Sequence, residues 1–535
     1  MYYHEALAQA LHDQQVTDMF GVLGDANLFF VERWARDGGR YVACAHEGSA
    51  VLAATGYAST SGGVGIATIT HGPALTNAVT ALVDASRARM PIVVLAGDTD
   101  PAARGHLQDI DQASVVAVTG AAFERASSPE TVTEDLARAL WRARAESRPV
   151  VLNLPITFQW QQIEEPTSAP LVTEVRRPRP HPDDLEDVAA ALVNAQRPIV
   201  LGGRGARDAR DELVALAERL GAPLATTLRG KGLFAGHPHD LGIFGTLAHP
   251  VALGAIDRAD LVVSFGAGLN QFTTAEGGLI EGKRVIQVDA DPARHRRRNA
   301  TDIAVAADAA HTATDLLTLL DEIGHRPSGF ADDALATALK SPRPPLPAPL
   351  GDRVELVAAL RRLDDAFPRD RTLVIDDGRF ILTAYAELGA PHPKAYVHTC
   401  SFASIGLGLA NAIGAQAGAP DRPALAVVGD GGFMSAGLNE LNTAVRHGQQ
   451  LVVVVVNDRA YGAEHIQLVQ RQMDPQITCF DWPDFAEAAS ALGARGISVR
   501  TMADLEVALE EVAQPAGVVL IDLVVDPHDV PGAFV

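Results

Sequence analysis

The sequence predicts an α/β protein made of three doubly wound domains with parallel sheets, and three observations support this fold class. Short apolar runs of strand length alternate along the chain with amphipathic stretches of helical length. Two proline-rich stretches, 164–182 and 341–351, divide that alternation into three parts. The length of 535 residues is also too great for one hydrophobic core. We expect domains at 1–165, 183–330 and 352–535.

The first part has the order of a parallel sheet covered by helices on both faces. Its predicted strands are Asp18–Val22, Tyr41–Cys44, Val64–Thr70, Ile92–Ala96 and Val150–Leu154. Its predicted helices are Tyr3–Gln14, Ser49–Ser59 and Leu75–Ala88. The strand Tyr41–Cys44 runs directly into the polar letters His46-Glu47-Gly48, which places a carboxylate at the point where strand turns into helix.

The middle part repeats the alternation. Its predicted strands are Ile199–Leu201, Pro223–Thr227, Leu261–Phe265 and Val285–Val288, and its predicted helices are Leu185–Ala195, Asp211–Leu220 and Thr312–Leu320. The turn Gly203-Arg204-Gly205 lacks a third glycine at the spacing of a dinucleotide-binding loop, so an ordinary turn from strand to helix is the better interpretation.

The third part contains the most informative stretch, in which two apolar strands flank one helix. Ala424–Val428 and Leu451–Val456 are the strands, and the helix between them ends near Gly448. Two strands joined by a single helix are parallel, so Asp430 and Asn457 both follow the carboxyl ends of neighbouring strands. A carboxylate and an amide oxygen at that edge suit Mg²⁺.

Glycines surround the acid of this stretch, and Gly429, Gly431 and Gly432 would let the backbone approach a diphosphate at a helix start. The letters GDG alone are most often an ordinary turn. Here 25 residues separate Gly431 from Asn457, and that combination resembles the thiamine diphosphate (ThDP) motif. The family usually has two Asn residues where this chain has Asn457 and Asp458. By resemblance, the backbone carbonyl of Arg459 is the third protein ligand of the metal.

Together, three α/β parts with these motifs resemble the ThDP-dependent 2-oxo acid decarboxylase and acetohydroxyacid synthase superfamily over nearly the whole chain. The segment HEGSAVLAATGYA, residues 46–58, is similar to the family's passage with its indispensable acid, and the match gives that role to Glu47. A carboxylic acid at a pyrimidine nitrogen promotes removal of the thiazolium proton. The alternative is that Glu47 only caps the following helix.

The same resemblance assigns further cofactor contacts. SFASIGLGLANAIGA, residues 401–415, resembles the glycine-rich helix start at which an apolar residue, here Ile405, props the bent cofactor. Ser404 would lie against the aminopyrimidine, Gly378 near the diphosphate, and Tyr461 on a segment that covers the cofactor. A core isoleucine and a plain amphipathic helix are the alternatives.

Three side chains are candidates for work on the substrate. THGPALTN, residues 70–77, is similar to an active-site loop in which some decarboxylases have a catalytic histidine, here His71. GHLQDIDQ, residues 105–112, resembles the next loop and would present Gln108. His465 follows the metal motif. A lone histidine on a loop is more often a surface residue, so the proton-transfer roles stay open.

Two departures from the synthases limit what the resemblance implies. Glu124 stands where synthases have a substrate lysine, and its charge is expected to disfavour a second anionic 2-oxo acid. The segment 266–271 lacks the arginine and acidic pair with which synthases hold FAD, so FAD is not expected.

The composition of the chain limits the classes of partner and the cellular location that we expect. The net charge of −22 argues against nucleic acid and anionic membranes as partners. The cysteines Cys44, Cys400 and Cys479 have no metal-ligand spacing, and the amino terminus lacks a secretion signal. No apolar run is long enough to span a bilayer, and the expected location is therefore the cytoplasm.

The sequence thus predicts a ThDP- and Mg²⁺-dependent enzyme that cleaves a carbon–carbon bond next to a carbonyl, most simply in a small 2-oxo acid. The fragment is then released, as in a lyase, or ligated, as in an acyl-transferring synthase. The resemblance implies a homodimer or homotetramer. The alternatives are a non-catalytic regulatory subunit of the same fold and a flavin-containing 2-oxo acid oxidase. Glu47 separates an enzyme from a regulatory subunit, because only the chemistry needs that acid.

Overall fold

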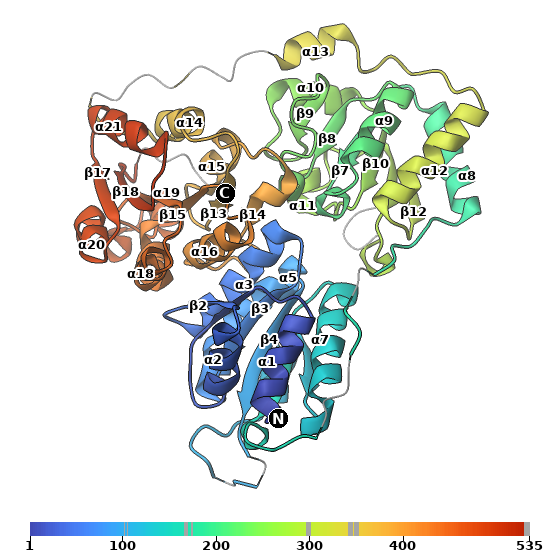
Figure 1. The fold of residues 1–535 in the computed structure, drawn as a ribbon. Coiled ribbons are helices and arrows are strands. Elements are labelled where there is room, and N and C mark those ends of the chain that lie inside the picture. The colour runs from blue at the N-terminus through green and yellow to red at the C-terminus, as the bar shows by residue number, and fades with distance from the viewer. Residues whose placement is uncertain are drawn as a thin grey trace. The chain divides into compact units, whose positions relative to one another are not determined.

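The computed structural model describes the chain except residues 101, 104, 165–168, 173–174, 296–300, 341–345, 347–351 and 529–535 (Figure 1). The predicted second linker, 341–351, therefore lies almost entirely outside the described residues. Two compact units are present. One comprises Met1–Val175, Ala348–Leu388 and Val397–Val535, and the other comprises Arg176–Pro347 and Gly389–Tyr396.

The first sheet has the order β2-β1-β3-β4-β6-β5, and its neighbouring strands are parallel. Its strands are β1 (Asp18–Gly21), β2 (Arg40–Ala43), β3 (Gly65–Ile69), β4 (Ile92–Asp98), β5 (Ala122–Arg125) and β6 (Val150–Pro155). The helices are α1 (Tyr3–Asp13), α2 (Leu28–Arg36), α3 (Glu47–Ser61), α4 (Pro73–Asn77), α5 (Val79–Ala88), α6 (Gln112–Ala117) and α7 (Val132–Glu146). One apolar cluster joins α1, α2 and α7 to the sheet, and another joins α3 and α5 to it, so both faces are covered.

The third sheet has the order β14-β13-β15-β16-β18-β17. Its strands are β13 (Thr372–Ile375), β14 (Tyr396–His398), β15 (Ala424–Gly429), β16 (Leu451–Asn457), β17 (Arg495–Val499) and β18 (Val518–Val524). Its helices are α14 (Leu356–Ala366), α15 (Ile381–Glu387), α16 (Gly408–Gly418), α17 (Asp430–Gly432), α18 (Leu438–Arg446), α19 (Gly462–Gln470), α20 (Phe485–Ala491) and α21 (Met502–Val512). Strand β16 is buried along its whole length, as the unbroken apolar run predicts for a central parallel strand.

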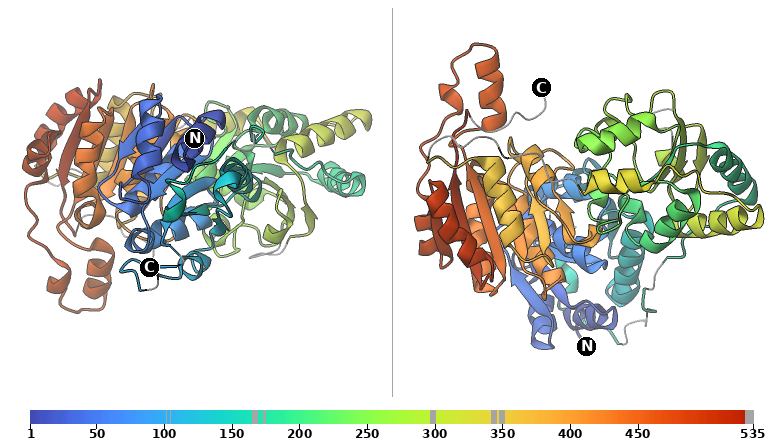
Figure 2. Two further views of the ribbon diagram at one scale, coloured as in Figure 1. Left: turned by 60° about the horizontal axis from the view of Figure 1, so that its bottom comes forward. Right: turned by 90° about the horizontal axis from the view of Figure 1, so that it is seen from above.

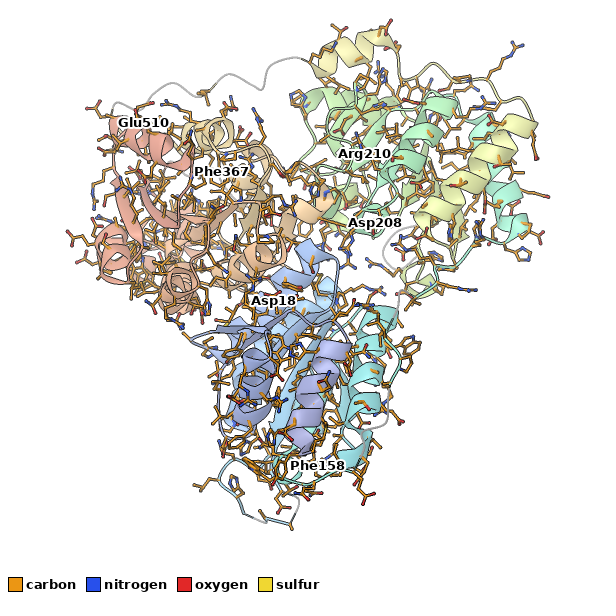
Figure 3. All side chains as sticks on the ribbon, in the orientation of Figure 1. Asp18, Phe158, Asp208, Arg210, Phe367 and Glu510 are labelled. Atoms are coloured by element: carbon orange, nitrogen blue, oxygen red, sulfur yellow. The ribbon has the colours of Figure 1, made fainter. Side chains whose placement is uncertain are left out.

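The first and third sheets share one apolar core, and the helices α3 and α16 form its centre (Figure 2). A Cβ at Gly56 would lie 2.0 Å from the Asn411 carbonyl, and one at Gly414 would lie 1.7 Å from the Ala53 carbonyl. The two backbones therefore approach so closely that glycine is required on each helix. Asp18, labelled in Figure 3, pairs with Arg40, whose guanidinium also donates to the Ala417 carbonyl.

The second unit contains a six-stranded sheet with the order β12-β11-β10-β7-β8-β9, and its neighbouring strands are parallel. Its strands are β7 (Pro198–Gly202), β8 (Leu224–Thr226), β9 (Asp240–Ile243), β10 (Leu261–Phe265), β11 (Arg284–Val288) and β12 (Ile303–Val305). Its helices are α8 (Pro182–Asn194), α9 (Arg210–Leu220), α10 (Pro250–Arg258), α11 (Gln271–Thr274), α12 (Ala309–Glu322) and α13 (Asp333–Leu339).

Three doubly wound parallel sheets are therefore present, and the predicted fold class is confirmed. Each sheet falls within one of the three predicted ranges, while the exact domain limits stay a prediction. Across the described residues, each helix is too short or too polar to cross a membrane.

Candidate active site

The strands β15 and β16 end side by side and bring Asp430 and Asn457 to one edge of the third sheet. Gly429 pairs with Val456 in the parallel register, so the residues that follow each strand emerge together. Asp430 starts the short helix α17, which continues through a π-helical turn, Phe433–Gly437, into α18. Such π-helical turns are frequent at functional sites. Asp430 and Asn457 therefore follow neighbouring strands at the same edge of the sheet, and the convergence of their side chains on one metal stays a prediction.

Asp430 is only 3% exposed, and both carboxylate oxygens accept hydrogen bonds. Oδ1 accepts from the Gly431 amide at 2.8 Å, and Oδ2 accepts from the Trp482 indole at 3.0 Å. Burial raises the pKa of Asp430, and the negative charge of nearby Asp458 raises it further. Burial raises the pKa of Asp458 as well. Two buried carboxyls thus sit where a divalent cation would favour their ionised forms.

Asn457 is also buried, and its side-chain orientation is fixed. Its Nδ2 donates to Asp522 Oδ1 at 2.8 Å, which leaves the amide oxygen for the loop that follows β16. The Arg459 amide donates to that oxygen at 3.3 Å, and Arg459 itself has the left-handed conformation, with φ of 56°. The chain therefore turns back at Arg459 immediately after the strand. Asn457 and the Arg459 backbone consequently lie at the same loop.

A cavity of about 440 Å³ opens next to these residues. Its lining comes entirely from residues 377–471. The predicted cofactor residues in the lining are Gly378, Ile405, Gly429, Gly431, Gly432 and Tyr461, and Asp430 lines it as well. A Cβ at Gly431 would lie 2.7 Å from the Tyr461 ring, so the ring lies directly over bare backbone. The cavity therefore joins the loop after β15 to the segment after β16.

The loop with Ser404 and Ile405 borders the same cavity. Ile405 is 38% exposed and lines the cavity, so its apolar side chain is accessible from the cavity. The carboxylate of Asp376, at the end of β13, accepts from the amides of Gly406 at 2.9 Å and Leu407 at 3.2 Å. This buried acid holds the loop in place, and burial raises its pKa to about 7.

Glu47 is the first residue of α3, which begins two residues before the predicted Ser49. His46 is the N-cap, because its Nδ1 accepts from the Gly48 amide at 3.1 Å. His46, and not Glu47, is therefore the residue that caps this helix. The Glu47 carboxylate is partly exposed and accepts from Asn77 Nδ2 at 3.0 Å. The Glu47 side chain thus lies just beyond the carboxyl end of β2, and one of its two oxygens already accepts a hydrogen bond.

His71 and Gln108 come together on the first sheet. A Cβ at Gly72 would lie 2.1 Å from the Gln108 carbonyl, so the two loops are in backbone contact. The His71 side chain is 1% exposed, and its Nδ1 lies 3.0 Å from Thr70 Oγ1 and 3.8 Å from Asp25 Oδ1. Burial lowers the pKa of His71, which keeps the ring neutral near pH 7.

His465 faces away from the cavity, although its neighbours Glu464 and Ile466 line it. The ring is 3% exposed, with Nδ1 at 3.2 Å from Thr478 Oγ1 and with His528 stacked edge-on at 5.6 Å. Burial lowers the pKa of His465. The ring thus anchors α19 to the segment near Thr478, and a role in proton transfer stays a prediction.

The charge argument from Glu124 is wrong. Glu124 lies on β5 and pairs with two guanidinium groups of α7, those of Arg138 at 3.0 Å and Arg142. The carboxylate is largely buried between them, so its negative charge is compensated. It therefore gives no reason to exclude a second anionic substrate.

Three residues at the site were missed by sequence reasoning. Arg379 is buried and lines the cavity, and its guanidinium donates to the Pro527 carbonyl. Trp482 donates to Asp430. Gln112 is buried and donates to Gly97, Asp98 and Asn153 while its carbonyl accepts from the Gly72 amide beside His71. Gln112 is the last residue of the loop 105–112. Its position immediately before an apolar helical run was the sequence feature that could have identified it.

These residues fit ThDP and Mg²⁺. The donor set of Asp430, Asn457 and the Arg459 carbonyl consists of hard oxygens, the ligands that Mg²⁺ prefers. The glycine backbone at 429–432 borders a cavity with the buried cation Arg379 in its lining, which suits a diphosphate. The exposed apolar side chain of Ile405 supplies a surface for a ring system.

Comparisons with known proteins agree with this fit. The family models of the thiamine pyrophosphate enzymes match residues 1–115 (N-terminal TPP binding domain), 185–316 (central domain) and 378–523 (C-terminal TPP binding domain). The chain is 31% identical over 530 residues to a probable 2-ketoarginine decarboxylase, AruI, from Pseudomonas aeruginosa, covering 97% of this chain and 93% of the relative.

Two further proteins are similar to this chain. The chain is 29% identical to a sulfoacetaldehyde acetyltransferase from Alcaligenes xylosoxydans xylosoxydans, over 95% of this chain and 89% of that protein. Among solved structures, a benzoylformate decarboxylase from Polynucleobacter necessarius superposes with a TM-score of 0.84 over 100% of both chains. The sequence identity in that pair is 22%, so it supports the fold alone.

Proposed function

The chain belongs to the thiamine pyrophosphate enzyme family, and we propose that it is a Mg²⁺-dependent member that decarboxylates a small 2-oxo acid. One observation supports this most strongly. Buried Asp430 and Asn457 meet at one strand edge beside a cavity, while Glu47 is kept at the start of α3. When bound, ThDP supplies the electron sink that cleavage next to a carbonyl requires.

In this proposal the third sheet holds the cofactor. Asp430, Asn457 and the Arg459 carbonyl bind Mg²⁺, which in turn neutralises the diphosphate. Gly378, Gly429, Gly431 and Gly432 would present backbone to the phosphates, Ile405 would support the rings of the cofactor, and Ser404 would contact the pyrimidine. Tyr461, already over Gly431, closes the diphosphate end of the cavity against water.

The first sheet supplies the proton chemistry. Glu47 would hold a proton at the pyrimidine ring nitrogen of bound ThDP and so supply the acid that activation of the cofactor requires. His71, neutral because it is buried, can accept a proton near the substrate, and Gln108 orients the substrate's oxygens. Gln112 positions the Gly72 backbone between these two loops.

We propose that the active unit is at least a homodimer, as the family resemblance implies. The cavity is lined by residues 377–471, and Glu47 lies on the other sheet of the same unit. Each cofactor would then lie between Asp430 of one subunit and the partner subunit's Glu47.

A complementation experiment tests the shared site. Glu47→Gln and Asp430→Ala chains are each expected to be inactive, and mixing them under conditions of subunit exchange should restore activity. Hybrids form about half of a randomly mixed dimer population and contain one intact site each, so roughly a quarter of wild-type activity is expected. Failure to recover activity despite exchange demonstrated by mass spectrometry would rule out the shared site.

A screen of several 2-oxo acids tests which substrate the enzyme accepts. One relative is described as a probable 2-ketoarginine decarboxylase, so we propose that a decarboxylation step comes first and that release or ligation of the remaining fragment follows. Release of CO₂ should be measured with 2-ketoarginine, pyruvate and benzoylformate, with and without sulfoacetaldehyde as acceptor. Absence of turnover with every 2-oxo acid, in protein shown to bind ThDP, would favour the regulatory-subunit alternative.

An absorption spectrum distinguishes the proposed decarboxylase from a flavin-containing oxidase. We expect the purified protein to show no flavin absorption in the visible range, since 266–271 lacks the arginine and acids with which synthases hold FAD. A flavin spectrum that corresponds to one flavin per chain would contradict this and support the oxidase.

A further inference from the structure

A buried carboxylate outside the cavity links the third sheet to the segment just before Glu47. Glu440 lies in the first turn of α18 and is 0% exposed. Its two oxygens accept from the Ala45 amide at 3.0 and 3.3 Å. Ala45 is two residues before Glu47, although Glu440 lies almost four hundred residues further along the chain.

The other end of α18 contacts the same segment twice more. Arg446 Nη2 donates to the Ala43 carbonyl at 2.8 Å, and the Ala43 amide donates to His447 Nε2 at 3.2 Å. Burial lowers the pKa of His447, and the charges of Arg446 and Arg40 lower it further, so the ring stays neutral and can accept. Residues 43–45 are therefore anchored along the length of one helix.

These hydrogen bonds hold the backbone just before the start of α3, which sets the direction in which the helix begins. Strand β2 ends at Ala43, His46 caps the helix, and Glu47 is its first residue. The body of α3 is already fixed by its close packing on α16. The freedom that remains lies in the backbone between Ala43 and Glu47, and the Ala45 bond restricts that stretch.

The chemical nature of residue 440 is also informative. A fully buried carboxylate loses its hydration, and this costs free energy that one backbone amide repays only in part. An apolar side chain would fill the same volume without that cost. A carboxylate at this place is explained by the need for an acceptor with a defined direction.

We propose that Glu440 is a positioning residue that sets the placement of Glu47, and this rests on the proposed function of Glu47. Glu440 touches neither substrate nor cofactor in this proposal, because it is absent from the lining of the cavity. Displacement of a catalytic group by about 1 Å can cost about 10²-fold in rate, so loss of the anchor should be visible in proton transfer.

The test compares Glu440→Ala and Glu440→Gln, with Asn439→Ala on the exposed side of the same helix as the control. The rate of hydrogen–deuterium exchange at the thiazolium carbon is measured by quench-flow NMR, and ThDP affinity by calorimetry. Glu440→Ala should slow exchange about tenfold or more, with affinity within about threefold of wild type. Glu440→Gln keeps an acceptor oxygen and should recover most of the rate.

A hybrid dimer makes the test directional. One chain carries Asp430→Ala and the other Glu47→Gln, which leaves a single complete site. Adding Glu440→Ala to the chain that supplies the intact Glu47 should slow exchange about tenfold more than adding it to the chain that holds the cofactor. Greater slowing when Glu440→Ala is in the chain that holds the cofactor would mean that the helix acts through its own metal loop. Equal slowing in both hybrids would mean that the effect has no direction. Either result would overturn the proposal.

Failure of this inference differs from failure of the proposed function. If Glu47→Gln slows exchange and Glu440→Ala does not, only the positioning role is lost. If Glu47→Gln exchanges as fast as wild type, the proposed role of Glu47 itself is wrong. Should Glu440→Ala not fold, the exposed Arg446→Ala removes the bond to the Ala43 carbonyl instead. About threefold slower exchange then supports the anchor, and a wild-type rate overturns it.

Discussion

Glu47→Gln is expected to slow exchange of the thiazolium proton by about 10²-fold or more and to abolish turnover, while ThDP still binds. The amide has nearly the shape of the acid, and it can still accept from Asn77. It cannot deliver a proton to the pyrimidine nitrogen, so the exocyclic nitrogen stays a weak base. Affinity should change little, because the proposed diphosphate and metal contacts all lie on the third sheet.

The matched control is Glu32→Gln, the same substitution at an exposed position of α2. NMR exchange rates of wild type, Glu32→Gln and Glu47→Gln are compared at saturating ThDP and Mg²⁺. Equal rates in all three proteins would remove Glu47 from the mechanism, whatever the effect on turnover.

Asp430→Ala is expected to abolish measurable retention of ThDP. The substitution removes a charged metal ligand and leaves the diphosphate without its bridging cation. The Trp482 indole would lose its acceptor as well. Calorimetric titration with ThDP, at fixed Mg²⁺, measures the loss, and Asp421→Ala at an exposed turn is the control. An unchanged, Mg²⁺-dependent affinity in Asp430→Ala would refute the metal site.

The wild-type site should also depend on pH with a definite sign. Mg²⁺ binds the ionised carboxylate, and burial raises the pKa of Asp430 in the metal-free protein. Binding therefore releases protons, and the affinity for Mg²⁺ should weaken as the pH falls from about 8 to about 6. Titrations in buffers of different ionisation enthalpy would detect the released proton, and its absence would contradict a raised pKa.

The fold class was predictable because its central strands are continuous apolar runs. Leu451–Val456 is too short to be a typical helix, so its unbroken apolar run predicts a buried strand. Strand β16 is indeed buried along its length. The strands that were not predicted lie at or next to a sheet edge, such as β5, β9 and β17. These three strands have four or five residues, are partly exposed and include charged residues, so neither periodicity nor apolar content distinguishes them from loops.

The site residues that could be predicted are those that belong to a recognisable sequence motif. Gly429 to Gly432 and Asn457 form a spaced motif, and the structure brings them to one edge. Trp482 reaches Asp430 from a distant segment, and nothing in its local sequence marks it. Arg379 directly follows the predicted Gly378, which was the available signal for it. Glu440 was even inside the quoted stretch, but a glutamate on a helix is usually solvated, and its burial depends on residues 43–45.

The packing of α3 on α16 has a consequence for biosynthesis. The two helices are separated by nearly 350 residues of chain, and the apolar core around them is built from both ends of the protein. During translation, the first sheet emerges with the small-residue face of α3 uncovered, and its partner is made only after the whole second unit. That unit is continuous from Arg176 to Pro347 and can collapse early, apart from the short segment Gly389–Tyr396. The nascent first sheet is therefore the part of this chain with the greatest need of a chaperone.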